Sequence, residues 1–159
     1  MPNTYSQIYI HLIFTVKNRN ALIVSRFKVE MHKYIAGILK NQGAKLLAIN
    51  SMPDHLHVFF GMEPSNRLSD LVRDIKSDTS LFINENKLSR FKFYWQEGYG
   101  AFSYSQSQKD SVIKYIINQE KHHRKKSFRE EYLEILEKFN IKYEPKYLFD
   151  FFDAKDFEK

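Results

Sequence analysis

The sequence predicts an α+β fold of the ferredoxin-like type, in which an antiparallel sheet of order βαββαβ carries helices on one face and leaves the other face free for a ligand. Three observations support this prediction: short alternating runs typical of strands, longer runs with apolar residues at helical spacing, and turn signals between them. The 159 residues and 43% hydrophobic content suffice for one well-buried core. We therefore expect a single domain over 1–159, with its core at about 5–130 and a C-terminal helix and aromatic tail at about 127–159.

The chain opens with a predicted strand and helix. Between Gln7 and Val16 the apolar residues occupy every second position, which is the period of a strand with one buried face. Ser25 can cap a helix whose apolar residues recur at helical spacing, and Gly43 marks its end. A strand followed by a helix is the expected start of the fold.

A hairpin and a second helix follow. The apolar-rich runs 45–51 and 55–61 are separated by a turn signal around Pro53, which predicts two adjacent antiparallel strands. A second helix should begin near Ser65 or Asn66 and turn its leucines, valine and isoleucines toward the core. Its other face presents the cationic residues Arg67, Arg73 and Lys76.

The next elements are a predicted fourth strand and a third helix. Phe91 to Gln96 alternates aromatic and polar residues before a glycine-containing turn at 98–100. Ser107 and Asp110 have the spacing of a capping box, so we expect a helix from Ser107 to about His123. The residues predicted to form its buried stripe are Val112, Ile113, Ile116 and Ile117.

A fourth helix and an aromatic tail complete the chain. Ser127 can cap this helix, with Glu130 at the capping-box position and aromatic residues along one stripe. The tail from Pro145 onward is rich in phenylalanine and tyrosine. We expect it to pack on this molecule or on a second copy.

Composition narrows the possible functions. Lysine and arginine total 25 against 19 acidic residues, which gives a net charge of +6 and favours a polyanionic partner. Cysteine is absent, which excludes disulfides, thiolate zinc sites and cysteine nucleophiles. The N-terminal residues lack the pattern of a secretory signal, and no apolar run approaches the roughly 20 residues that span a bilayer. We therefore expect a cytoplasmic protein without a membrane partner.

His55 and His57 stand out in the second strand of the hairpin. Alternate side chains of a strand point to the same face, so the two imidazoles project side by side and can bind one metal ion. A pair of histidines in a strand is also compatible with ordinary half-exposed residues. The spacing alone therefore leaves both interpretations open.

Tyr115 and Gln119 stand out in the third helix. They lie four residues apart, one above the other, on the side opposite the predicted buried stripe. Tyr115 can cover a neighbouring loop, or it can act as a nucleophile if a cation favours its phenolate, because a phenol has a pKa near 10. The amide oxygen of Gln119 is a hard ligand suited to Mg²⁺ or Mn²⁺.

Taken together, these motifs resemble those of the single-tyrosine HUH transposases of bacterial insertion sequences, the IS200-like group, and their domesticated relatives, the REP-associated tyrosine transposases. The resemblance covers about residues 5–130 and follows one order along the chain. Its motifs are the turn Lys17-Asn18-Arg19, Pro53-Asp54-His55-Leu56-His57-Val58, Trp95-Gln96 with Gly98-Tyr99-Gly100-Ala101-Phe102-Ser103, and Tyr115-Ile116-Ile117-Asn118-Gln119.

The resemblance implies a DNA transposase that cuts and rejoins single-stranded DNA beside a hairpin. It assigns nucleophilic attack to Tyr115 and binding of Mg²⁺ or Mn²⁺ to His55, His57 and Gln119. It further implies a 5′-phosphotyrosine intermediate, no nucleotide cofactor, and a homodimer in which one subunit's tyrosine helix can complete the other subunit's histidine site. Tyr104 and Tyr99 are the next candidates for the nucleophile.

Basic residues provide the expected contacts with DNA phosphates. The predicted DNA-binding residues are Lys17, Arg19, Arg73, Lys76, Lys121, Arg124, Lys125 and Lys126. The cluster after Tyr115 is equally compatible with a solvated helix end. His122 and His123 are expected to be structural or exposed rather than metal ligands, and His11 is expected to serve packing.

Two alternatives remain open. A non-catalytic RNA- or DNA-binding module shares the βαββαβ order, and Gly98-Tyr99-Gly100-Ala101-Phe102 partly matches the signature of RNA-recognition domains. That signature belongs on the strand before the second helix, whereas this run follows the helix. The second alternative is a domesticated nickase that no longer moves an element, which only the flanking DNA can distinguish.

Overall fold

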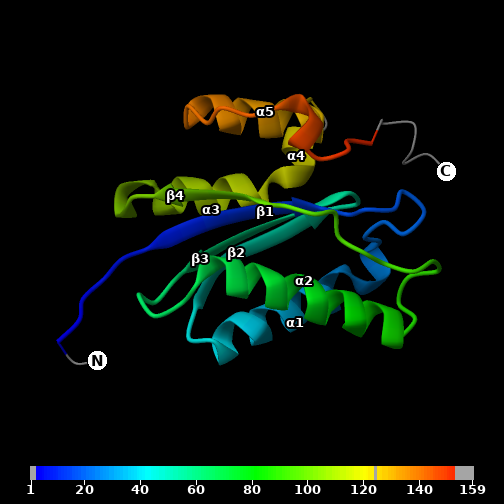
Figure 1. The fold of residues 1–159 in the computed structure, drawn as a ribbon, viewed down its shortest axis with the longest axis horizontal. Helices are drawn as coiled ribbons and strands as arrows, with labels where there is room; N and C mark the ends of the chain where they lie inside the picture. The colour runs from blue at the N-terminus through cyan, green and yellow to red at the C-terminus, as the bar shows by residue number, and fades with distance from the viewer. Residues whose placement is uncertain (1–2, 124, 153–159) are drawn as a thin grey trace.

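The computed structural model describes residues 3–123 and 125–152 (Figure 1). Within these residues a four-stranded sheet is combined with five α-helices and two 3₁₀ turns. In chain order the elements are β1 Tyr9–Thr15, α1 Ser25–Asn41, β2 Lys45–Met52, β3 His55–Gly61, α2 Leu68–Glu85, β4 Gly100–Tyr104, η1 Gln106–Gln108, α3 Lys109–Ile117, α4 Gln119–His123, α5 Phe128–Lys138 and η2 Pro145–Tyr147. None of the helices described is long and apolar enough to cross a membrane.

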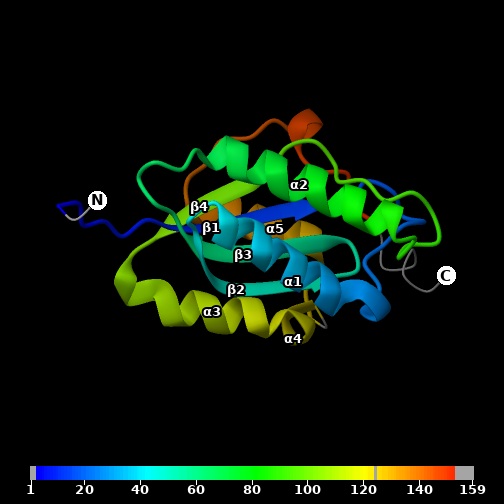
Figure 2. The same ribbon diagram turned by 90° about the horizontal axis from the view of Figure 1, so that it is seen from below.

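The sheet has the order β2-β3-β1-β4, and each neighbouring pair of strands is antiparallel. β1 and β3 are therefore central, and Leu12 of β1 pairs with Val58 of β3. Helices α1 and α2 cover one face of the sheet, whereas α3, α4 and α5 lie over the other (Figures 1 and 2). This arrangement confirms the predicted ferredoxin-like fold with additional C-terminal helices.

The main core lies between the apolar faces of helices α1 and α2 and the sheet face that they cover. Phe27, Met31 and Ile35 of α1 recur at helical spacing and are fully or almost fully buried. Leu12 and Phe14 belong to the same cluster, since alternation along β1 directs both to one face. This core fixes β1 and β3 relative to the helices and gives the opposite sheet face a rigid support.

The opposite face of the sheet is closed rather than free for a ligand. Val112 and Ile116 of α3 form a second apolar cluster with Ala48 and Phe59. Over the β4 side, Phe139 at the end of α5 stacks on Phe102 with ring centroids 5.2 Å apart. Because bases cannot reach these covered aromatic side chains, the structure opposes the alternative of an RNA-recognition module that reads bases on its sheet.

The fourth strand differs from the prediction. The segment 91–96 contributes only an isolated bridge between Val16 and Trp95, and the fourth strand of the sheet is Gly100–Tyr104. Side chains of α2 explain the difference, because Asn84 bonds both the amide and the carbonyl of Phe93, and Trp95 donates to Thr79 at 2.9 Å. The alternation of 91–96 thus reflects side chains buried against a helix.

The predicted third helix from Ser107 to His123 is interrupted. A 3₁₀ turn precedes α3, Asn118 separates α3 from α4, and the capping box joins Ser105 and Gln108 instead of Ser107 and Asp110. The side-chain amide of Asn50 on β2 donates to the carbonyl of Ile116 at 2.9 Å, which satisfies a group at the helix end. Ile117, predicted to be buried, is 60% exposed at this break.

The other helix ends agree with the prediction to varying degrees. α1 ends before Gly43, whose φ of +79° suits glycine, but Ser25 is its first residue and makes no cap bond. α2 begins at Leu68, later than predicted. The predicted cap of α5 is confirmed, because the Ser127 hydroxyl accepts a hydrogen bond from the Glu130 amide at 3.2 Å.

The described part of the aromatic tail packs on its own chain. Phe149 is buried, and its ring lies 5.0 Å from that of Tyr132 on α5. Gln96 holds the tail by two hydrogen bonds: its amide donates to the Asp150 carbonyl at 2.9 Å, and its oxygen accepts from the Asp150 amide at 2.8 Å. The tail therefore supports α5 from its outer side.

Gly100 sets how closely α5 approaches β4. A Cβ atom at Gly100 would lie 2.6 Å from the Tyr132 hydroxyl and 2.8 Å from its ring. We expect Gly100→Ala to lower the free energy of unfolding by about 1–3 kcal/mol, because the ring and α5 must move away. Urea denaturation measures this loss, with Gly37→Ala as the control.

Gly37 lies within α1, and a methyl group added there would meet no neighbouring atom within 4 Å, so Gly37→Ala should be neutral or stabilising. Equal stability of the Gly100→Ala variant and the unsubstituted protein would contradict close packing of Tyr132 on β4.

Candidate active site

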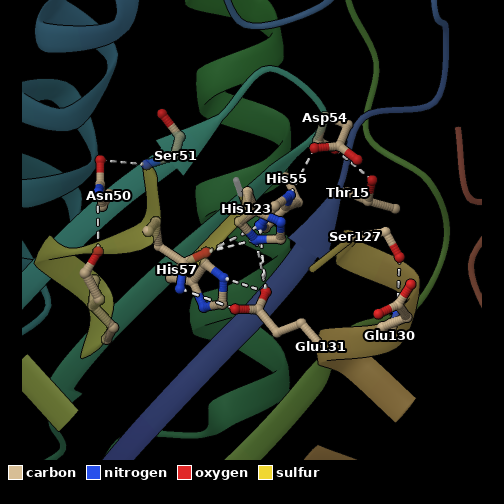
Figure 3. A network of polar contacts seen from close by, with 12 residues as sticks. Thr15, Asn50, Ser51, Asp54, His55, His57, His123, Ser127, Glu130 and Glu131 are labelled. Atoms are coloured by element: carbon tan, nitrogen blue, oxygen red, sulfur yellow. Dashed lines mark hydrogen bonds and ion pairs between the residues drawn. The ribbon is translucent and has the colours of Figure 1, made fainter. Parts of the chain in front are cut away.

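The two histidines of β3 point from the sheet toward the C-terminal helices. His55 and His57 are both fully buried, and their ring centroids lie 5.0 Å apart (Figure 3). Their shared direction follows from the strand period that the sequence shows. Their complete burial does not, because it requires α4 and α5 to close over the sheet.

Each imidazole is oriented by a partner at its Nδ1 atom. Nδ1 of His55 lies 2.7 Å from Oδ1 of Asp54, and a carboxylate can only accept, so this nitrogen carries the proton. Nδ1 of His57 lies 2.8 Å from Nε2 of His11, which is 1% exposed. His11 was expected to serve packing, but the structure makes it a direct partner of His57.

Gln119 reaches the same place from α4. Its side chain is fully buried, and its Oε1 atom lies 3.4 Å from Nε2 of His55 and 3.0 Å from Nε2 of His123. The structure therefore brings together all three residues predicted to bind metal. His123, expected to be structural or exposed, borders the cluster.

Tyr115 approaches from the end of α3. Its hydroxyl donates a hydrogen bond to Oε2 of Glu131, and its ring centroid lies 6.1 Å from that of His57. Burial, the charge of Glu131 and this hydrogen bond raise the pKa of Tyr115 well above that of a free phenol. The phenol is therefore held protonated beside the imidazoles of its own chain.

One residue of this cluster, Glu131 of α5, was not predicted from the sequence. Its side chain is 4% exposed, and its Oε1 atom lies 3.2 Å from Nε2 of both His57 and His123 (Figure 3). A signal was present, because Glu131 falls between Phe128 and Tyr132 on the apolar stripe of its helix. A charged residue on such a stripe indicates a buried partner.

The electrostatics of the cluster follow from burial and from this carboxylate. Burial alone would raise the pKa of Glu131, but His57, His123 and His55 outweigh it and hold that pKa far below its usual range. Burial lowers the pKa of His57 and also that of His11. Glu131 is therefore an anion within a buried group of imidazoles.

The donor atoms suit a divalent cation. Nε2 of His55 faces two oxygens, Oε1 of Gln119 at 3.4 Å and Oε1 of Glu131 at 3.6 Å. An imidazole nitrogen, an amide oxygen and a carboxylate oxygen therefore converge on one place, and Nε2 of His123 lies within 3.2 Å of both oxygens. A mixed set of imidazole, amide and carboxylate donors is compatible with Mg²⁺, Mn²⁺ or Zn²⁺.

Comparison with known proteins identifies the family. Residues 4–119 match the family model described as "Transposase IS200 like", and this range contains both site histidines, Tyr115 and Gln119. The chain belongs to the IS200-like transposase family. The geometry above is therefore that of a transposase of this family, as the sequence resemblance implied.

Individual relatives of this transposase are distant in sequence. The ISDra2 transposase TnpA of Deinococcus radiodurans is 24% identical over 118 residues, which covers 71% of this chain and 84% of that protein. A solved structure of a candidate transposase from Deinococcus radiodurans R1 shares the fold with a TM-score of 0.57 and 21% identity, and the match covers 74% of this chain and 94% of that one.

A second solved structure extends the likeness to the C-terminal helices. A REP-associated tyrosine transposase bound to a REP hairpin matches with a TM-score of 0.57 and 16% identity, and the match covers 97% of this chain and 93% of that chain. The family model ends at residue 119, so α5 and the tail lie outside it. The fold that includes these elements thus recurs in a solved relative.

The predicted DNA-binding residues fall into separate places. Lys121, Lys125 and Lys126 line a cleft of about 1120 Å³ between α3, α4 and α5 that also contains Tyr115 and Glu131. Lys126 additionally pairs with Glu134 at 2.5 Å. Arg124 lies outside the described residues.

The remaining cations of the prediction lie away from Tyr115. Lys17 and Arg19 line a smaller pocket with Tyr94 and the tail. Arg73 of α2 pairs with acidic residues of its own helix, and Lys76 donates to the carbonyls of Gln96 at 2.8 Å and Gly98 at 2.5 Å. Because α2 covers the opposite sheet face, Arg73 and Lys76 do not join the cleft.

His11 provides a test of the partner at His57. The partner at the second nitrogen of a metal-binding imidazole orients the ring, and its loss typically weakens metal binding about 10- to 100-fold. We expect His11→Phe, which keeps a ring but removes the hydrogen-bonding nitrogen, to weaken Mn²⁺ binding by about tenfold, as measured by isothermal titration calorimetry.

His11→Gln is the matched control, because its amide can still bond His57 and should retain more of the Mn²⁺ affinity. The same affinity in both variants as in the unsubstituted protein would show that His11 does not orient His57.

Proposed function

We propose that this transposase cuts and rejoins single-stranded DNA beside a hairpin, with Tyr115 as nucleophile and a divalent cation, Mg²⁺ or Mn²⁺, bound by His55, His57 and Gln119. The observation that carries this proposal is the meeting of these side chains in one buried cluster of a single chain. No nucleotide cofactor is required, because the phosphotyrosine bond retains the energy of the broken phosphodiester.

The reaction starts from the phenol of Tyr115. Its oxygen attacks a backbone phosphorus atom, the bond between phosphorus and the 3′-oxygen breaks, and the phenolic proton ends on the departing 3′-hydroxyl. The 5′-phosphate is then joined to Tyr115, and attack by another 3′-hydroxyl reverses these changes. A cation bound at the imidazoles supplies Lewis-acid chemistry, since it draws negative charge from the phosphate under attack.

The side chains around Tyr115 prepare this step. The hydroxyl is fixed by Glu131, so the nucleophile has one orientation before DNA arrives. Burial of His55 and His57 excludes water from their inner edges. The open side of Tyr115 faces the cleft lined by Lys121 and Lys125, whose charges suit a phosphate backbone.

A DNA hairpin is the partner that we propose. The solved relative that matches 97% of this chain was determined with a REP hairpin, and the cleft beside Tyr115 is basic. Hairpin flanks are single-stranded, which leaves the scissile phosphate accessible to a side chain at the base of a cleft. The predicted phosphate contacts of Lys17, Arg19, Arg73, Lys76 and Arg124 remain part of this proposal.

We also propose a homodimer, as the family resemblance implies. Tyr115 already meets His57 within one chain, so dimer formation need not exchange tyrosine helices to complete the cluster. Sedimentation of the full chain, with and without a hairpin, measures the assembly. A monomer under both conditions would remove this part of the proposal.

Tyr115→Phe tests the nucleophile. The variant lacks the attacking oxygen, so covalent attachment to labelled single-stranded DNA in the presence of Mn²⁺ should fall below detection, whereas hairpin binding should remain within about threefold. Denaturing gel electrophoresis measures attachment, and a gel-shift assay measures binding. Attachment by this variant would move the nucleophile to Tyr104 or Tyr99.

His57→Ala and Gln119→Ala test the metal site. Each variant removes one proposed ligand, so cleavage at limiting Mn²⁺ should fall by about 100-fold or more, while higher Mn²⁺ restores part of it. Cleavage rates over a range of Mn²⁺ concentrations measure the effect. Unchanged metal dependence in both variants would place the cation elsewhere.

A further inference from the structure

Glu131 connects two groups that the proposed reaction uses for different purposes. Its Oε1 atom lies 3.2 Å from Nε2 of His57 and 3.6 Å from Nε2 of His55, while its Oε2 atom accepts the hydrogen bond of the Tyr115 hydroxyl. One carboxylate thus contacts the Nε2 edges of both imidazoles, as Figure 3 shows, and also the hydroxyl of the proposed nucleophile. The sheet, α3 and α5 meet at this residue.

The distances around Glu131 match those of a metal site. Ligand atoms of His55, His57 and Glu131 all lie within 4.8 Å of one another. Donors placed about 2.1 Å from a common ion lie about 3–4.2 Å apart, so small side-chain shifts suffice for all of them to bind it. No other histidine or acidic cluster of this kind occurs among residues 3–123 and 125–152.

The charge of Glu131 also suits this role. Two imidazoles and the amide of Gln119 form a neutral ligand set, whereas a carboxylate adds one negative charge that favours a dication. A buried carboxylate is otherwise unfavourable unless it is paired. Tyr115, His57 and His123 already pair with Glu131, and a cation at the imidazoles would add a full positive charge to these partners.

We infer that Glu131 is a further ligand of the divalent cation through Oε1 and, through Oε2, the residue that positions the Tyr115 hydroxyl beside it. This inference rests on the proposed function of Tyr115. α5 is then part of the active centre, although it lies beyond the range matched by the family model.

Packing on both sides holds Glu131 in this position. The ring of Phe128 stacks on the His55 imidazole, with centroids 3.8 Å and planes 7° apart. Tyr132 lies directly over Gly100 of β4. Because these two residues flank Glu131 on α5, its carboxylate is directed at the imidazoles by packing of the helix and not by its own hydrogen bonds alone.

Mn²⁺ binding without DNA tests the ligand role. Isothermal titration calorimetry on the full chain should show at least a tenfold weaker Kd for Glu131→Gln, because a charged ligand becomes a neutral one. Glu130→Gln is the matched control, since it removes the same charge from the exposed adjacent position and should leave the Kd unchanged. Equal Kd values for Glu131→Gln and the unsubstituted protein would overturn the inference.

Attachment at saturating Mn²⁺ tests the positioning role. With Mn²⁺ at about 100 times the variant's Kd, Glu131→Gln should still attach DNA at least tenfold more slowly, because Tyr115 has lost its charged acceptor. An attachment rate equal to that of the unsubstituted protein at saturating Mn²⁺ would overturn the positioning role and leave Glu131 only the role of a ligand. Conservative replacement by Glu131→Asp should restore more of the Mn²⁺ affinity than of the attachment rate, since its carboxylate is withdrawn from Tyr115.

Thermal unfolding of the metal-free variants controls for folding. Should Glu131→Gln lack a cooperative transition, Glu131→Asp takes its place in both measurements, and an unchanged Kd and attachment rate in that variant would overturn the inference. The two proposals fail differently. Failure of Tyr115 as the nucleophile would appear as attachment of DNA by Tyr115→Phe. Failure of the Glu131 ligand role would appear as an unchanged Mn²⁺ Kd in Glu131→Gln, measured in titrations that contain no DNA.

Discussion

The contact of the β3 imidazoles with the C-terminal helices is the interaction on which the rest of the structure depends. His55 and His57 leave the sheet toward Gln119 of α4 and Glu131 of α5, which meet them at 3.2–3.4 Å. Without these helices, two imidazoles would face solvent from an open sheet. Because α4 and α5 cover this sheet face, the two imidazoles lie in a buried polar cluster between the sheet and the helices.

A polar cluster of this kind is stable only if its groups are paired, because an unpaired buried polar group costs about 1–3 kcal/mol. Asp54 pairs with His55, His11 with His57, and Glu131 with the edges of both imidazoles. Among the described residues, Nδ1 of His11 is the buried side-chain atom left without a partner. Partners on or beside the strands, Asp54 and His11, therefore orient the two imidazoles, and Glu131 of α5 covers them from the helix side.

Contacts between aromatic rings connect this cluster with the C-terminal end of the described chain. Phe128 covers His55, Phe149 and Phe151 cover Phe128, and Gln96 binds the backbone of Asp150. The tail thus supports the helix that carries Glu131.

Patterns among residues close together in the sequence were sufficient to predict several of the strands and helices. Periodicity predicted β1, the hairpin and the first two helices, and alternation placed His55 and His57 on one face, because each of these features depends on residues close together in the chain. Helical spacing predicted that Tyr115 and Gln119 lie together, and they do so although the helix is interrupted between them at Asn118. The capping box predicted the start of α5 for the same reason.

Contacts between distant segments decided the rest. Asn84 and Thr79 of α2 form hydrogen bonds with residues 91–96, which therefore lie against the helix and not in the sheet. Asn50 of β2 binds the carbonyl of Ile116 near the end of α3. The sequence by itself singled out His55, His57, Tyr115 and Gln119 as candidate site residues. Only the tertiary structure decided that Glu131 joins them, since a carboxylate in a helix acquires its partners from the surfaces that enclose it.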